Sequence, residues 1–526
     1  MKKRLSHNIR PLLYGCLTGI ICGAVIALFL VCARVVASFA MSVYSLPHTA
    51  LAVVCTLILV ILCCVFTAVL QILVPAAKGS GIPMSEGAAR GMLRVKWLRS
   101  AAALIAGSLL AFLSGMPLGS EGPSIGVGGM IGDGVGRVAK KPIQFRRYLI
   151  TGGSSAGLAV AFNAPLTGVA FALEETHRRF SPAILIAAFS AVVPAVMTAQ
   201  LIYWGFSQSS YLYGLGVRPG MAALPFLTQA SYKTVAALFA VCGIAAISGV
   251  ICALLASAFN RCIFVLSKLF GKINNAFLRL LPVFLLTALC GLCLHNVIGS
   301  GEATFEHVSV STAAGMLILL IALRFVMTTA ASGSSATGGL FLPMIAIGGI
   351  TGTLIAKAAI ACGMSEKFAP NVIMLTISAF FAASAHAPIS AAIMCVELTA
   401  SFANLLPCAV AVGLATAISG LLRTEPLYEH MMENLYKQSV ADGDDVTLSG
   451  VIPERSFICD RRIRDVLWPH NSLVTSLTRG DVDIVPDGET VLRAGDVLTI
   501  RAENVDVTSF SQQMQDYIIQ DGKDKQ

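Results

Sequence analysis

Residues 119–129 read GSEGPSIGVGG, and residues 339–349 read GLFLPMIAIGG. Both stretches begin with glycine, carry proline at the fifth place and end in two glycines, and they lie 220 residues apart. The triplet Gly-Ser-Gly at residues 79–81 returns at the same distance, at residues 299–301. Two separate blocks in one register indicate an internal duplication.

A third match lies further along each half. Glu174 follows Pro165 by nine residues, and Glu397 follows Pro388 by nine residues. The two prolines are 223 residues apart, so a three-residue insertion reconciles this block with the others. Duplicated halves are a recurring plan of secondary transporters, whose substrate sites lie between the repeats where helices are interrupted. The residues alone leave open whether the halves are inverted.

The composition is that of a membrane protein. Hydrophobic residues make up 56% of the 526 residues and charged residues 12%, and the mean hydropathy is +0.79. A soluble domain with so few charges could not cover its own surface. Apolar runs that approach or reach the roughly 20 residues of a membrane-spanning helix recur along the chain. They are Leu12–Leu30, Leu51–Leu73, Thr234–Ala258, Leu281–Val297, Ala313–Val326 and Cys408–Leu422. We therefore predict an all-α polytopic protein embedded in a lipid bilayer.

The first apolar run is predicted to be a retained helix. It continues to Ala40 with only Arg34 interrupting it, and no cleavage site is evident. The cations Lys2, Lys3, Arg4 and Arg10 precede it, and by the positive-inside rule they place the N-terminus in the cytoplasm. The formal charge of +9 then reflects cytoplasmic loops and not nucleic-acid binding.

After Val440 the composition changes to a charged segment with no run long enough to span a membrane. Strand-like stretches at Ser472–Thr478 and Thr490–Arg501, separated by turn signals, predict a small α+β domain. We expect a membrane region at residues 1–437, with halves at about residues 10–205 and 230–425, and a soluble cytoplasmic tail at residues 438–526.

Of the 15 cysteines, most lie in apolar runs, where they behave as small hydrophobic residues. No CxxC pair has polar flanks, so neither a metal site nor any other cofactor is predicted.

The glycine and proline breaks are the candidate site. A helix that starts inside a membrane exposes N–H groups, and these groups and the helix dipole favour an anion. Ser80, within the first Gly-Ser-Gly triplet, adds a hydroxyl donor. The alternative is close helix packing by small residues.

Glu121 stands between glycines and apolar segments, where a charged carboxylate costs about 2.5–3.5 kcal/mol at mid-membrane unless it is protonated or paired. A carboxylate beside anion-binding amides can occupy the place of the anion when it is ionised, and it must leave or take a proton to admit one. The alternative is a structural cap. Glu174 and Glu175 could pair with the cations at residues 177–179, and Tyr428 could be an interfacial aromatic residue.

These motifs, in this order, resemble the CLC family of chloride channels and chloride/proton antiporters, over roughly residues 10–437. They are GSGIP at residues 79–83, GSEGP at 119–123, GLFLP at 339–343 and the later Tyr428. The resemblance implies a homodimer with one pore per subunit, two inverted halves and many short, tilted helices. Such proteins are not enzymes.

The resemblance also implies residue roles. Ser80 and Tyr428 would give hydroxyls to a chloride ion, and Leu340 and Phe341 would give backbone amides. Glu121 would be the gating glutamate, and Glu175 the second acid that antiporters use to pass protons. Its presence favours a chloride/proton antiporter over a passive chloride channel. Serine at position 80 favours chloride over nitrate, and together with Tyr428 it argues against the fluoride branch.

Two further features concern the family pattern. Most members carry Arg or Lys directly before the gating glutamate, where this chain has Ser120. The loss of this positive charge is expected either to weaken anion attraction at the outer site or to raise the proton affinity of the glutamate, and so to change the rate or the pH dependence. The tail is similar to the TrkA-C type of regulatory domain and not to paired CBS domains. It is expected either to bind a ligand that is still unknown or to support a dimer.

A second class of function remains open from one motif. Residues 153–157 read GSSAG, which fits the G-x-S-x-G pattern of serine hydrolases. That pattern needs a strand-turn-helix setting with a base and an acid nearby. Here apolar helical sequence flanks it, which favours small-residue packing.

Overall fold

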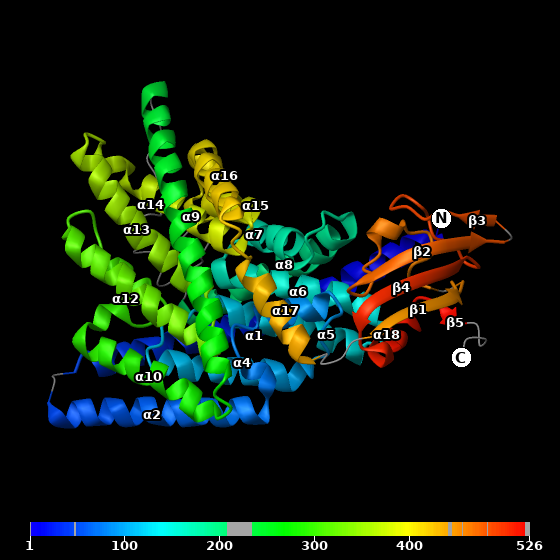
Figure 1. Cartoon of the computed structure of the whole chain (residues 1–526), viewed down its shortest axis with the longest axis horizontal. Coiled ribbons are helices and arrows are strands. Elements are labelled where there is room, and N and C mark those ends of the chain that lie inside the picture. The colour runs from blue at the N-terminus through cyan, green and yellow to red at the C-terminus, as the bar shows by residue number, and fades with distance from the viewer. Residues whose placement is uncertain are drawn as a thin grey trace.

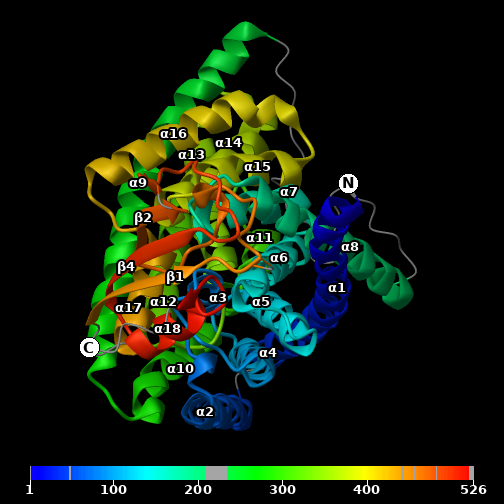
Figure 2. The same cartoon turned by 90° about the vertical axis from the view of Figure 1, so that its right-hand side faces the viewer.

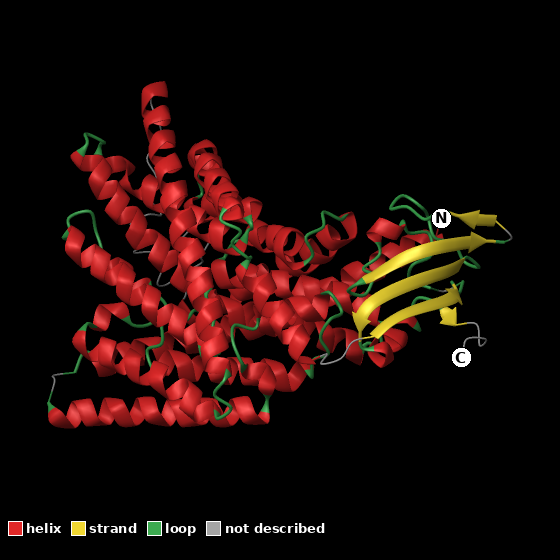
Figure 3. Ribbon diagram, in the orientation of Figure 1, coloured by secondary structure: helices red, strands yellow, loops and turns green. Residues whose placement is uncertain are grey.

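The computed structural model describes residues 2–46, 49–207, 234–439, 444–454, 456–480 and 482–520, with only the backbone for residues 2–11, 303, 306, 438–439 and 520. Helices fill most of the molecule, and a small sheet lies at one end of its long axis (Figures 1 and 3). Within these residues, nine helices are long and apolar enough to cross a membrane. The prediction of an all-α polytopic protein with a small mixed tail is confirmed.

The first half contains α1 (Lys2–Tyr44), α2 (Ala50–Leu73), α3 (Ile82–Ala89), α4 (Trp97–Leu113), α5 (Glu121–Val138), α6 (Ile143–Phe162), α7 (Pro165–Phe171) and α8 (Pro182–Ser207). The second half contains α9 (Val235–Gly271), α10 (Ala276–Cys293), α11 (Glu302–His307), α12 (Ala314–Gly333), α13 (Phe341–Ala361), α14 (Ala369–Ala385), α15 (Pro388–Thr399) and α16 (Leu405–Leu421). The helix α17 (Leu427–Ser439) follows the second half.

The repeated blocks mark helix starts. Gly81 caps the N-terminus of α3 with a φ of +82°, a left-handed conformation that favours glycine, and Pro83 is accommodated in the first turn. The two copies of the longer block open α5 and α13. The chain is thus broken where the sequence predicts, and each break leaves a helix N-terminus inside the protein.

Each half supports the other in the same way. Gly119 donates its N–H to the Gly339 carbonyl at 2.8 Å, and Gly339 donates to Gly119 at 2.7 Å. The Glu174 carboxylate accepts hydrogen bonds from two N–H groups in the first turn of α15, and the Glu397 carboxylate accepts from two in the first turn of α7. Equivalent residues therefore exchange equivalent contacts, as expected of two related halves packed about a pseudo-two-fold axis.

Small residues pack α5 against α6. A Cβ atom at Gly128 would lie 2.1 Å from the Gly153 carbonyl oxygen, and one at Gly157 would lie 2.2 Å from the Ser124 carbonyl oxygen. The GSSAG motif is buried inside α6, far from any strand-turn-helix setting. The packing alternative is therefore correct for this motif.

The tail is a five-stranded antiparallel sheet with strand order β3-β2-β4-β1-β5. Its elements are β1 (Asp444–Val451), β2 (Ser472–Arg479), β3 (Val482–Ile484), β4 (Val497–Val505), α18 (Val507–Met514) and β5 (Ile519–Gln520). The predicted strand at Ser472–Thr478 is β2. The strand predicted at Thr490–Arg501 begins only at Val497. A turn precedes it, in which Gly495 has a φ of +86°. The composition change after Val440 falls on residues 440–443, which lie outside the described residues.

The tail docks on the ends of α5 and α6, and the start of α1 lies at this same end of the molecule (Figures 1 and 2). Arg147 of α6 is buried and donates to the carbonyls of Leu467 at 2.6 Å and Trp468 at 3.2 Å. Asp516 accepts a hydrogen bond from the N–H of Ile143, the first residue of α6. Burial raises the pKa of Tyr517 to about 12, so its hydroxyl stays protonated and donates to the Leu467 carbonyl at 2.6 Å.

Candidate functional site

Three helix N-termini from distant parts of the chain meet in the centre of the membrane region. A Cβ atom at Gly122 would lie 2.7 Å from the Gly339 Cα and 2.7 Å from the Ser80 carbonyl oxygen. The residues just before α3 and α13 therefore contact the first turn of α5 through the backbone, and no side chain fits between them. The first N–H groups of a helix have no intrahelical partner, so this junction gathers hydrogen-bond donors and the positive ends of three helix dipoles.

Two hydroxyls belong to the elements around this junction. Ser80 is buried directly before the cap of α3, where its Oγ accepts from the Ile82 N–H at 3.4 Å and its own hydrogen is available to an acceptor. Tyr428 is fully buried, and no described residue hydrogen-bonds its hydroxyl. Its helix, α17, packs against α3. A buried unpaired hydroxyl costs roughly 1–3 kcal/mol, so a bound anion that accepts its hydrogen bond would remove a penalty.

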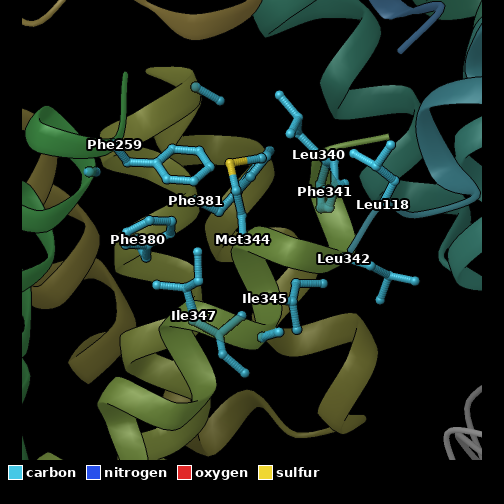
Figure 4. Packing of buried hydrophobic residues seen from close by; sticks show 14 of the residues in the cluster. Leu118, Phe259, Leu340, Phe341, Leu342, Met344, Ile345, Ile347, Phe380 and Phe381 are labelled. Carbon is cyan, nitrogen blue, oxygen red and sulfur yellow. The ribbon is translucent and has the colours of Figure 1, made fainter. Parts of the chain in front are cut away.

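Leu340 and Phe341 form the start of α13 and are buried. The Phe341 ring packs between Phe162, at a centroid distance of 4.7 Å, and Phe381, at 4.2 Å. Figure 4 shows Leu340 and Phe341 within this apolar packing, beside Leu118. The side chains are thus held by packing, while the N–H groups at the helix start remain the polar contribution of this segment.

Glu121 is the first residue of α5, and only 1% of it is exposed. Its Oε1 accepts a hydrogen bond from the Ser120 hydroxyl at 3.4 Å. Its Oε2 is so close to Gly119 that a Cβ atom on that glycine would lie 2.4 Å from it. The carboxylate is therefore folded against the backbone of the glycine block, at the positive end of α5. It also lines a cavity of about 570 Å³.

Glu175 lies in a π-helical turn (η2, Ala172–Thr176) that directly continues α7, and only 1% of it is exposed. Arg90 binds the turn from α3 by donating to the carbonyls of Glu175 at 2.7 Å and Thr176 at 2.6 Å. The Oε2 atom of Glu175 is buried and finds no hydrogen-bond partner among the described residues. An ionised carboxylate is costly to bury without a hydrogen-bond partner.

The alternative in which Glu174 and Glu175 pair with the adjacent cations does not hold among the described residues. Arg178 pairs instead with Glu429 of α17 at 2.6 Å, and the His177 ring contacts the Thr151 hydroxyl at 2.7 Å. Glu174 is used to cap α15. The two neighbouring glutamates thus point to different parts of the protein.

Sequence reasoning missed Glu86. It lies in α3, five residues after Gly81, and only 1% of it is exposed. Both of its carboxylate oxygens are buried with no hydrogen-bond partner in the described part of the chain. A signal was available, because Glu86 is the only acidic residue in the first 120 positions.

A second cavity of about 550 Å³ lies where the tail meets the membrane region. Its lining is rich in cations, but these are largely committed: Arg137 and Arg146 both pair with Asp133 at 2.6 Å, and Arg147 binds tail carbonyls. Among the described residues, no cluster of three or more His, Cys, Asp or Glu side chains is arranged to hold a metal ion.

Comparison with known proteins agrees with this geometry. The family model described as voltage gated chloride channel matches residues 63–420. The chain belongs to this family. The TrkA-C domain model matches residues 451–515, so both resemblances seen in the sequence are confirmed.

Individual relatives lie in the same family. The H(+)/Cl(-) exchange transporter ClcA of Yersinia pestis is 31% identical over 383 residues, which cover 70% of this chain and 75% of that protein. ClcA of Vibrio parahaemolyticus is 29% identical over 371 residues, covering 69% and 76%. The crystal structure of a slow cyanobacterial Cl−/H+ antiporter is similar with a TM-score of 0.71 at 26% identity, covering 82% of this chain and 98% of the other. A CLC-type fluoride/proton antiporter has the same fold, with a TM-score of 0.63 at 20% identity, covering 78% and 96%.

Proposed function

We propose that this family member exchanges chloride for protons across a cell membrane, with Glu121 as both gate and proton carrier. The observation that carries the proposal is the combination of an anion-attracting junction with the buried acids Glu121 and Glu175. Glu121 stands at the junction itself, and Glu175 stands at the turn after α7. Relatives that are named chloride/proton exchangers support the same conclusion.

The anion is held by dipoles and not by a fixed cation. The Ser80 and Tyr428 hydroxyls donate to it, and the N–H groups at Leu340 and Phe341 add the positive end of α13. Neutral donors bind an anion strongly enough to strip part of its water shell but weakly enough to release it, which a transport site requires.

Proton coupling follows from competition for one place. When Glu121 is ionised, its carboxylate takes the role of an anion at the start of α5. When a proton neutralises it, the carboxyl group loses that attraction and swings toward the cavity, and chloride enters. Glu175 delivers the proton to Glu121 or accepts it from Glu121 along a route separate from the chloride path. Proton and chloride therefore share only the part of the path near Glu121.

A passive chloride channel of the same fold is the alternative. A channel needs the anion junction and a gate, but it has no use for a second buried acid. Glu175 is costly to bury and accepts no hydrogen bond at its Oε2 from the described residues. Its retention in such a place favours the exchanger.

The proposal includes the assembly and its orientation. The start of α1 and the tail are at one end of the molecule, and we assign both to the cytoplasmic side, so that the cavity at Glu121 opens to the outside. We also propose a homodimer, with the tail either binding a regulatory ligand or supporting the dimer.

The test is anion and proton flux in proteoliposomes, recorded together. The wild type is expected to move protons uphill when a chloride gradient drives it. Glu121→Gln and Glu175→Gln are expected to abolish this proton movement while chloride binding or flux persists. Glu433→Gln, at an exposed position in α17, is the matched control and should leave coupling unchanged. Chloride flux without uphill proton movement in the wild type would establish the channel instead, and absence of any chloride flux would refute both.

A further inference from the structure

Arg34 is an unexplained charge in a membrane helix. The span Leu12–Tyr44 has a mean hydropathy of 2.7 over its most apolar window, and Arg34 is its only Asp, Glu, Lys or Arg. It lies in the last quarter of α1 (Lys2–Tyr44), and the start of this helix is the end that lies beside the tail (Figure 1). A charged side chain in an apolar span is costly and is retained mainly where it serves a function, so its surroundings are informative.

Arg34 lines the same cavity as Glu121. This cavity, of about 570 Å³, is bounded by α1, by Ser120 and Glu121 at the start of α5, and by the second Gly-Ser-Gly triplet at residues 299–301. Of the described residues that line it, Arg34 is the only lysine or arginine. The other titratable groups among the described lining residues are Glu121, Tyr203, His295, Glu302 and His307.

Arg34 forms no ion pair with a described residue. Its one described contact is with the Tyr203 ring of α8, with the guanidinium carbon 5.9 Å from the ring centroid. An aromatic face orients a guanidinium without cancelling its charge. Among its described lining residues, the cavity therefore contains one cationic arginine that is not held in an ion pair, and this arginine comes from a helix that takes no part in the anion junction.

We propose that Arg34 is the anion-attracting cation of this cavity, supplying from α1 the charge that the position before Glu121 lacks. Ser120 occupies the place where the family resemblance implies a basic residue. A unit charge acts on an anion over several ångströms, and low-dielectric cavity walls focus its field. A positive charge at residue 34 can therefore serve the same step as one at residue 120, because either raises the chloride concentration beside the gate. This inference rests on the proposed chloride transport.

The competing role is structural, in which Arg34 only fastens α1 to α8 through Tyr203. The two roles differ in what they depend on. Attraction of an anion depends on charge and ionic strength, and a positive charge placed elsewhere in the same cavity can replace it. Fastening depends on the shape of the side chain, and a cation at residue 120 cannot restore it.

The experiment measures the chloride dependence of flux in proteoliposomes for the full chain. Arg34→Gln is expected to raise the KM for chloride by about two- to tenfold while the maximal rate changes less. Raising the ionic strength with an inert salt should shrink this difference, since exposed charges are screened beyond about 10 Å at 0.1 M. Arg34→Lys should keep most of the wild-type affinity, and adding Ser120→Arg to Arg34→Gln should restore it.

Controls separate this inference from the proposed function. Lys367→Gln removes an exposed cation that does not line the cavity and should leave the KM unchanged. The thermal stability of each variant in detergent shows whether the substitution weakens the contact between α1 and α8. An unchanged KM in Arg34→Gln, or a raised KM that Ser120→Arg and added salt do not alter, overturns the inference while leaving chloride transport intact. Failure of the wild type to move chloride overturns the proposed function instead.

Discussion

Glu174 and Glu175 are adjacent in sequence, yet exchanging each for glutamine should damage different properties. The Glu174 carboxylate accepts from the N–H groups of Ile389 at 2.8 Å and Ser390 at 2.6 Å, in the first turn of α15. Glu175 accepts no such bond at its Oε2 within the described residues. We expect Glu174→Gln to lower stability with proton coupling retained, and Glu175→Gln to abolish coupling with stability retained.

The magnitude for Glu174 follows from those two bonds. Each hydrogen bond to a charged group contributes about 1.5–3 kcal/mol, and a negative charge at a helix N-terminus adds about 0.3–1 kcal/mol. Glutamine keeps one acceptor oxygen but turns an NH₂ group toward the second N–H. We therefore expect Glu174→Gln to cost about 2 kcal/mol and Glu174→Ala about 4 kcal/mol.

The stability of each variant is measured by thermal unfolding in detergent, with the loss of the monodisperse peak in size-exclusion chromatography as the signal. A chain of this size should lose on the order of 2–4 °C in Tm. Glu397→Gln is the internal standard, because Glu397 makes the equivalent contacts with Leu166 and Thr167 of α7. Equal stability losses for Glu174→Gln and Glu175→Gln, or loss of coupling in Glu174→Gln, would show that the assignment of roles from these contacts is incorrect.

Other contacts give further expectations. Tyr428→Phe removes a buried hydroxyl donor and should weaken chloride binding about tenfold in calorimetric titration; unchanged affinity would exclude the hydroxyl as an anion ligand. Gly128→Ala brings a Cβ atom within 2.1 Å of a backbone oxygen of α6 and should prevent recovery of folded protein, whereas Gly413→Ala, with nothing within 4 Å, should not. In the tail, burial opposes the charge of Asp496, but two hydrogen bonds from Arg479 at 2.8 Å hold its pKa below its usual value. This stabilisation is complete above the unfolded pKa of about 3.9 and is lost as the pH falls through the folded value. Asp496→Asn should therefore cost roughly 2 kcal/mol at neutral pH and flatten the acid limb of thermal melts, and an unchanged acid limb would contradict the assignment.

The class of the protein and the places where its helices break could be predicted from residues alone. Hydropathy reports burial in lipid directly, and a duplication shows itself as a constant offset between blocks. Glu121 also stood out, because a carboxylate between glycines in an apolar stretch is costly wherever the chain places it. The assignment of Ser80, Leu340, Phe341 and Tyr428 to an anion remains a prediction that the flux and binding measurements test.

Side-chain roles that depend on distant partners could not be predicted in this way. Nothing local distinguishes Glu174 from Glu175; only the packing of α15 against α7 gives one of them a helix to cap. Glu86 and Arg34 were visible as isolated charges, but their neighbours come from helices far along the chain. Composition and periodicity fix how each segment meets lipid or water, because that depends on the segment itself. Which charge faces which cavity depends on how segments pack against one another, and the tertiary structure alone decides it.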